Sequence, residues 1–121
     1  MADIFRDREK AYESKYKMNE ELKFKAESRR NRLLGEWLAG RFGLTAEEKK
    51  AYAKDVVVAD MEAPGIEDLI RKVMKDIAAH GATITERKVR KKIKELSDLA
   101  FEQVSKEFPK ALGPDHGRVG D

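Results

Sequence analysis

The side chains that could perform catalysis are few in this sequence, and their spacing matches no catalytic arrangement. The two histidines, His80 and His116, have no metal-ligand spacing with each other or with a carboxylate motif, so the sequence predicts no zinc site. The chain has no cysteine, and no serine has a plausible histidine partner, so a nucleophilic triad lacks its parts. A glycine-rich loop for phosphates is also missing. We therefore expect no catalytic residues, no metal and no cofactor, and a protein that is not an enzyme.

Two clusters of basic residues are the other candidates for a functional site. In the stronger one, at residues 86–94, six of nine residues are Lys or Arg, which could bind nucleic-acid phosphates. The alternative, which we favour, is an amphipathic helix in which Val89 and Ile93 face the core and the long basic side chains cover its edges. The second cluster adjoins a predicted core stripe and consists of Arg29, Arg30 and Arg32. The sequence leaves open whether this second cluster is a docking surface or a solvated face.

The overall composition favours a small helical protein with a mixed surface charge. The chain has 121 residues, which suits one domain, and 40% of them are charged, including many Lys, Arg and Glu, which are good helix formers. The net charge of +3 lacks the basic excess typical of nucleic-acid binders, so we expect no nucleic-acid partner. No apolar run approaches the ~20 residues of a membrane span, and the N-terminus lacks the apolar core of a signal peptide. These features predict a cytoplasmic protein without direct membrane insertion.

Apolar periodicity and helix-capping signals predict an all-α fold, a four-helix bundle over residues 18–108. The four expected helices cover about residues 18–41, 46–62, 66–80 and 86–108. Thr45 and Glu48 have the spacing of a capping box at the start of the second helix. Thr85 suits the N-cap of the fourth helix, and Thr83 is the other candidate.

Two local features of these helices allow more than one interpretation. The valine run at 56–58 could indicate a strand, but charged residues flank it without a turn signal, so we favour a helix. His80 lies at the expected end of the third helix, where a cation is stabilised. Gly81 follows it and suits a left-handed C-cap.

Residues 1–17 form a segment whose apolar pattern differs from that of the bundle. Phe5, Tyr12 and Tyr16 follow an i, i+7, i+11 spacing and so share one helical face. The stripe that continues the helix restarts out of phase, at Leu22, Ala26, Leu33 and Trp37, with Leu34 and Leu38 beside them. Three aromatic side chains cannot offset the ~1–2 kcal/mol of entropy lost for each ordered backbone residue. We therefore expect a flexible N-terminal arm, intrinsically disordered alone, whose aromatic residues bind a partner. We also expect a disordered C-terminal tail at 109–121, which is rich in glycine, proline and polar residues.

Several segments of the chain resemble one protein family. They are residues 5–16, FRDREKAYESKY; residues 20–26, EELKFKA; residues 29–35, RRNRLLG, together with Trp37; and residues 51–57, AYAKDVV. The combined pattern is similar to the zeta subunit of bacterial F-type ATP synthases and covers about residues 3–108. The family pattern does not explain the tail.

The resemblance implies a four-helix inhibitor of ATP hydrolysis by the catalytic head of an F-type ATP synthase. It implies that the arm inserts at an alpha/beta catalytic interface near the rotor subunit gamma and blocks rotation in the hydrolytic direction. The implied partners are the alpha, beta and gamma subunits, and we expect a protein that is peripheral to the inner-membrane synthase and monomeric when free. Carried over by position, the partner-binding residues are Ile4, Phe5, Arg6, Arg8, Lys10, Tyr12 and Tyr16. The alternative, from the residues alone, is a nucleic-acid-binding helical module that uses residues 86–94.

Overall fold

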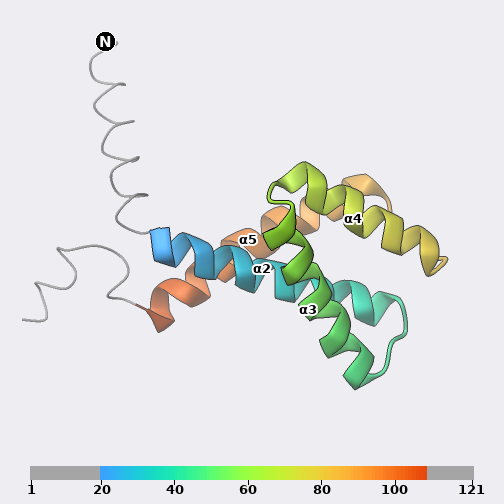
Figure 1. The fold of residues 1–121 in the computed structure, drawn as a ribbon, viewed down its shortest axis with the longest axis horizontal. Coiled ribbons are helices and arrows are strands. Elements are labelled where there is room, and N and C mark those ends of the chain that lie inside the picture. The colour runs from blue at the N-terminus through green and yellow to red at the C-terminus, as the bar shows by residue number, and fades with distance from the viewer. Residues whose placement is uncertain (1–19, 109–121) are drawn as a thin grey trace, which may run out of the picture.

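The computed structural model describes residues 20–108, and this part of the chain is helical apart from short connections (Figure 1). Its helices are α2, Glu20–Arg41; α3, Ala46–Glu62; α4, Ile66–Ala79; and α5, Glu86–Glu107. The expected all-α, four-helix fold class is confirmed. The arm, with all of its candidate partner-binding residues, and the tail lie outside the described residues.

The two long helices, α2 and α5, lie side by side, and α2 begins at the end of the molecule where α5 finishes (Figure 1). Helix α3 packs against α2, while α4 contacts both α3 and α5. Helix α2 is therefore held on two of its sides. No helix in the described part of the chain is both long and apolar enough to cross a membrane.

Local signals set the ends of the helices where the sequence predicts them. At the start of α3, the Thr45 hydroxyl accepts a hydrogen bond from the Glu48 N–H, and the Glu48 carboxylate accepts one from the Thr45 N–H at 2.9 Å. Thr85 caps α5 by accepting a hydrogen bond from the Lys88 N–H at 3.1 Å. Gly81 has a φ of 65°, the left-handed conformation expected after α4. Both predicted N-caps and the predicted glycine are thus confirmed.

All four described helices contribute side chains to the core. Its fully enclosed members, 0% exposed, include Leu34, Leu38, Val56, Val73 and Val89. Of the stripe that the sequence predicts for α2, Leu22, Leu34 and Leu38 are buried, whereas Leu33 and Trp37 are only partly buried. The width predicted for this stripe fits the packing of α2, which contacts α3 on one side and α5 on another.

Helices α2 and α3 touch backbone to backbone at Gly35. A Cβ atom placed on Gly35 would lie 2.6 Å from the Cα atom of Ala53, closer than side-chain carbons approach backbone. Glycine is therefore needed at this position because it has no side chain. The valine run at 56–58 lies inside α3 near this contact, so its helical interpretation is confirmed.

Replacing Gly35 by alanine tests the importance of this contact. Alanine is favoured over glycine by ~1 kcal/mol in a helix interior, but its methyl group would displace the backbone of Ala53. We expect Gly35→Ala to lower the free energy of unfolding by ~1–3 kcal/mol, the usual cost of overpacking, as measured by chemical denaturation. The matched control is Gly40→Ala, which should keep or raise stability because the nearest atom is the Lys49 Nζ at 3.9 Å. Equal stabilities of the two variants would contradict the contact.

Candidate functional site

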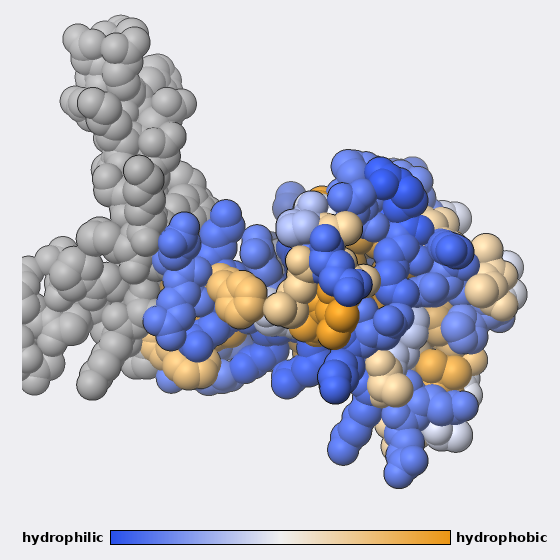
Figure 2. All heavy atoms as spheres, viewed as in Figure 1, coloured by the Kyte–Doolittle hydropathy of each residue, from blue (hydrophilic) through white to orange (hydrophobic). Residues whose placement is uncertain are grey.

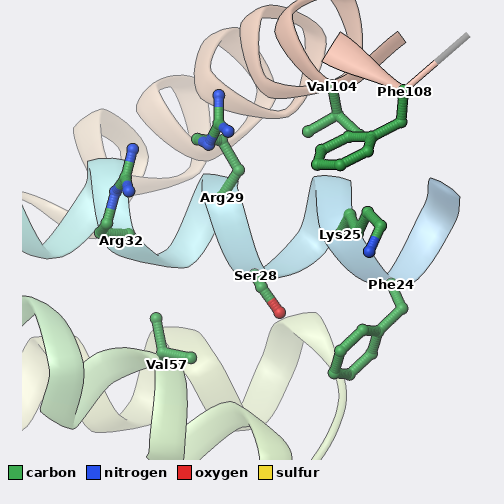
Figure 3. Close-up of a pocket in the computed structure, with 8 residues that line it drawn as sticks. All are labelled: Phe24, Lys25, Ser28, Arg29, Arg32, Val57, Val104 and Phe108. Atoms are coloured by element: carbon green, nitrogen blue, oxygen red, sulfur yellow. The ribbon is translucent and has the colours of Figure 1, made fainter. Parts of the chain in front are cut away.

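A groove lies between α2, α3 and the end of α5, with a cavity volume of about 320 Å³ (Figure 3). Its polar lining comes from α2 and consists of Lys25, Ser28, Arg29 and Arg32. Its apolar walls are Phe24 of α2, Val57 of α3, Val104 of α5 and Phe108, which follows α5. Figure 2 shows apolar patches interrupting the hydrophilic surface at this end of the molecule. Cations and accessible apolar surface are therefore combined where α2 begins.

Arg29 links α2 to the last turn of α5 through a bidentate ion pair. Its guanidinium donates to both carboxylate oxygens of Glu107, at 2.8 Å from Nη1, and Nη1 also donates to Gln103 Oε1 at 2.9 Å. The hydrogen bond from Arg29 holds the pKa of the Glu107 carboxyl below its ordinary value, and the same bond raises the pKa of Arg29. Because a bidentate pair fixes direction as well as distance, it orients the start of α2 relative to α5.

Lys25 and two aromatic rings form the mouth of the groove. The Lys25 ammonium lies 4.7 Å from the ring centroid of Phe108, a cation–π distance, and 3.2 Å from the Glu21 carboxylate. Phe24 is 55% exposed and Phe108 is 41% exposed. Both rings therefore keep much of their apolar surface in contact with solvent.

Arg30 belongs to the interface between α2 and α3 and is almost completely buried, with 8% exposure. Its Nη2 lies 3.6 Å from Asp60 Oδ2, and its Nε donates to Asn31 Oδ1 at 3.0 Å. Asn31 in turn donates to Asp60 Oδ2 at 2.7 Å. The other carboxylate oxygen, Asp60 Oδ1, is buried without a hydrogen-bond partner among residues 20–108. This polar network bridges the two helices beside their backbone contact.

The basic run predicted as a docking surface or a solvated face is divided among three environments. Arg29 is paired at the groove, Arg30 is buried, and Arg32 has a side chain that is 53% exposed and 3.9 Å from Glu36. The structure therefore brings Arg29 and Arg32 together at the groove but not Arg30. One sequence signal separates them: Arg30 precedes the core residue Leu34 by four positions, about one helical turn.

The basic segment at 86–94 begins α5, and the burial expected of Val89 and Ile93 is confirmed. Arg90 is already paired within the protein, since its guanidinium lies 2.9 Å from the Glu67 carboxylate of α4. A cation that holds two helices together contributes less to binding external phosphates. The geometry thus favours the amphipathic interpretation of this segment.

A second polar cluster joins the connection after α2 to α3 and α4. His80 lies at the end of α4 as expected, with Nδ1 at 2.9 Å from the Asp76 carbonyl oxygen and its ring stacked on Phe42 at 4.2 Å. Tyr52 donates to the Asp76 carboxylate at 2.7 Å, and burial raises the pKa of its hydroxyl. Lys72 lies 2.8 Å from the same carboxylate. Because Tyr52 lies on α3 while Asp76 and Lys72 lie on α4, these contacts fasten the two helices together. Within residues 20–108 no three potential metal ligands converge.

Comparison with known proteins relates the whole pattern to one family. A family model described as ATPase inhibitor subunit zeta matches residues 1–103. The matched range takes in the arm together with α2, α3, α4 and most of α5. No curated protein matches the chain. Phe108, which lines the groove, and Glu107, which pairs with Arg29, lie beyond the matched residues.

The pKa of Glu107 reports on the ion pair between Arg29 and Glu107 at the groove. Because the folded-state pKa of this carboxyl is depressed, the pair stabilises the fold above the pKa of an unfolded glutamate. That contribution is lost as the pH falls through the folded value. We expect Arg29→Met to raise the pKa of Glu107, as measured by carboxyl-carbon NMR. The matched Arg32→Met variant should raise it less, since Arg32 acts only through its charge. An unchanged pKa in Arg29→Met would contradict the pairing.

Proposed function

The chain belongs to the ATPase inhibitor subunit zeta family, and on this premise we propose how it inhibits ATP hydrolysis. The arm, residues 1–17, inserts at an alpha/beta catalytic interface of an F-type ATP synthase, close to the rotor subunit gamma. There it blocks rotation in the hydrolytic direction. The observation that carries the proposal is the family match over residues 1–103, which includes the arm as well as the bundle.

The arm has a composition suited to a buried contact with a large partner. Phe5, Tyr12 and Tyr16 share one helical face, and aromatic side chains often dominate the energy of protein interfaces. Ile4 adds apolar surface next to Phe5. The charged contacts to acidic groups of the catalytic interface come from Arg6, Arg8 and Lys10.

The bundle serves as the anchor for the helix from which the arm departs. Helix α2 begins at Glu20, directly after the arm region. It is tied to α5 through Arg29 and to α3 through Asn31, by hydrogen bonds of 2.8 and 2.7 Å. An arm that blocks rotation must itself be held in place. These ties therefore support the proposal that the bundle anchors the arm.

Deleting residues 2–17 tests the assignment of inhibition to the arm. The variant keeps every described residue of the bundle, so we expect an unchanged unfolding transition and helical circular dichroism. The variant should no longer inhibit the ATP hydrolysis that an F-type ATP synthase performs, because the segment proposed to block rotation is absent. Full inhibition by the truncated protein would overturn the proposal.

Substitutions within the arm separate side-chain contacts from arm length. The variant Phe5→Ala, Tyr12→Ala, Tyr16→Ala should raise the half-inhibitory concentration at least roughly 30-fold, since one aromatic hot spot contributes ~2 kcal/mol or more. The matched control is Asp7→Ala with Ser14→Ala, because at about 100° per residue both lie on the opposite helical face. Equal losses in the two variants would show that the partner does not recognise the aromatic face.

A further inference from the structure

One face of α2 forms the floor of the groove. Its members follow one another at intervals of one helical turn, and they are Phe24, Lys25, Ser28, Arg29 and Arg32. Figure 3 shows Val57 of α3 along one border of this floor and Val104 and Phe108 along the other. A helix laid along α2 would therefore meet cations on the floor and apolar side chains at both borders.

The cations on this floor differ in how firmly they are held. Arg29 is fixed by its bidentate ion pair with the end of α5. The Arg32 side chain is 53% exposed, and its Nε is 3.9 Å from the Glu36 carboxylate, too far for a hydrogen bond. Lys25 pairs with Glu21, a residue of the same helix whose side chain is 73% exposed. Because exposed pairs one turn apart on a helix stabilise little, Lys25 and Arg32 can exchange these partners for carboxylates of another protein.

The apolar borders define the rest of the occupant's chemistry. Phe24 and Phe108 are 55% and 41% exposed, and the cavity of about 320 Å³ is many times the ~30 Å³ that one water occupies. An aliphatic side chain has room in it. No carboxylate lines the groove within residues 20–108, so acidic groups of a partner meet no like charge on its walls. Nucleic-acid binders usually contact many phosphates, so two exchangeable cations beside apolar walls suit an acidic amphipathic helix better.

We propose that the groove docks an acidic amphipathic helix of the catalytic head of an F-type ATP synthase. The partner's carboxylates face Lys25 and Arg32, which lie ~10 Å apart along α2 at 1.5 Å per residue, and an aliphatic side chain packs beside Phe24. The groove begins four residues after Glu20, the first residue of α2, so a partner engaged just before α2 lies within its reach. The identity of the partner rests on the proposed function, whereas the chemistry of the groove does not.

The affinity of the full chain for an isolated catalytic head tests the docking. Arg32→Glu combined with Phe24→Ser should raise the dissociation constant at least roughly tenfold, because it reverses one charge and removes one apolar wall. The matched control is Arg87→Glu combined with Phe101→Ser, which makes the same exchanges at exposed positions of α5 outside the groove. The control should leave the dissociation constant nearly unchanged, and both variants should keep the unfolding transition of the original chain.

A photo-crosslinker in the groove identifies the occupant. Because the chain contains no cysteine, Ser28→Cys gives a single attachment point on the groove floor. The crosslinked peptide should come from a subunit of the catalytic head and should contain Asp or Glu together with aliphatic residues. The control attachment point is Arg87→Cys, at the opposite end of α5 from Phe108, and it should give a much lower yield.

Three results would overturn the docking. They are equal affinities of the groove variant and its control, a crosslink from position 28 to a second copy of this chain, and binding of duplex DNA that Arg32→Glu weakens as strongly. The groove variant retains the arm, so it should still inhibit fully at saturating concentration. Unchanged affinity of this variant, with inhibition lost on deletion of residues 2–17, would reject the docking and leave the proposed function standing. Weakened affinity, with inhibition retained after that deletion, would reject the role of the arm and leave the docking standing.

Discussion

The contact between the backbones of α2 and α3 at Gly35 and Ala53 sets the spacing on which the rest of the structure depends. Because the helices lie this close, Asn31 reaches Asp60 across the interface, and Val57 reaches the groove. A wider separation would leave a buried carboxylate without its amide and guanidinium partners, which is costly in a protein interior. One missing side chain thus determines both the stability of the α2–α3 pair and the shape of the groove beside it.

The helices were predictable because their ends are encoded in short stretches of sequence. Thr45, Glu48 and Thr85 satisfy backbone N–H groups that have no partner inside a helix, so the caps can be recognised without knowing the fold. Gly81 marks a helix end for a similarly local reason, since the chain adopts a positive φ there. The family could likewise be recognised from the sequence alone, because the resemblance rests on residue types at fixed spacing along one chain.

The candidate site was less predictable because it depends on contacts between helices. Arg30 lies within a basic run, and only its pairing with Asp60 on another helix distinguishes it from its exposed neighbours. Arg29 is fixed by Glu107, which lies on the last turn of α5, far along the sequence. The groove itself requires the relative positions of three helices and the ring of Phe108. Apolar periodicity contains none of this information, and it does not show which members of the α2 stripe are completely buried.

The full burial of Leu34 and Leu38 bears on the direction that the proposed arm would take if it continued α2. Five turns of an α-helix take about 18 residues, and Tyr16 precedes Leu34 by that number, as Tyr12 precedes Arg30. An uninterrupted backward extension of α2 would therefore carry the aromatic face on the same azimuth as the inner face of the helix. Turning α2 by one residue would rotate its inner face by about 100°, so the contacts around Asn31 and Asp60 fix the orientation from which any such extension would start.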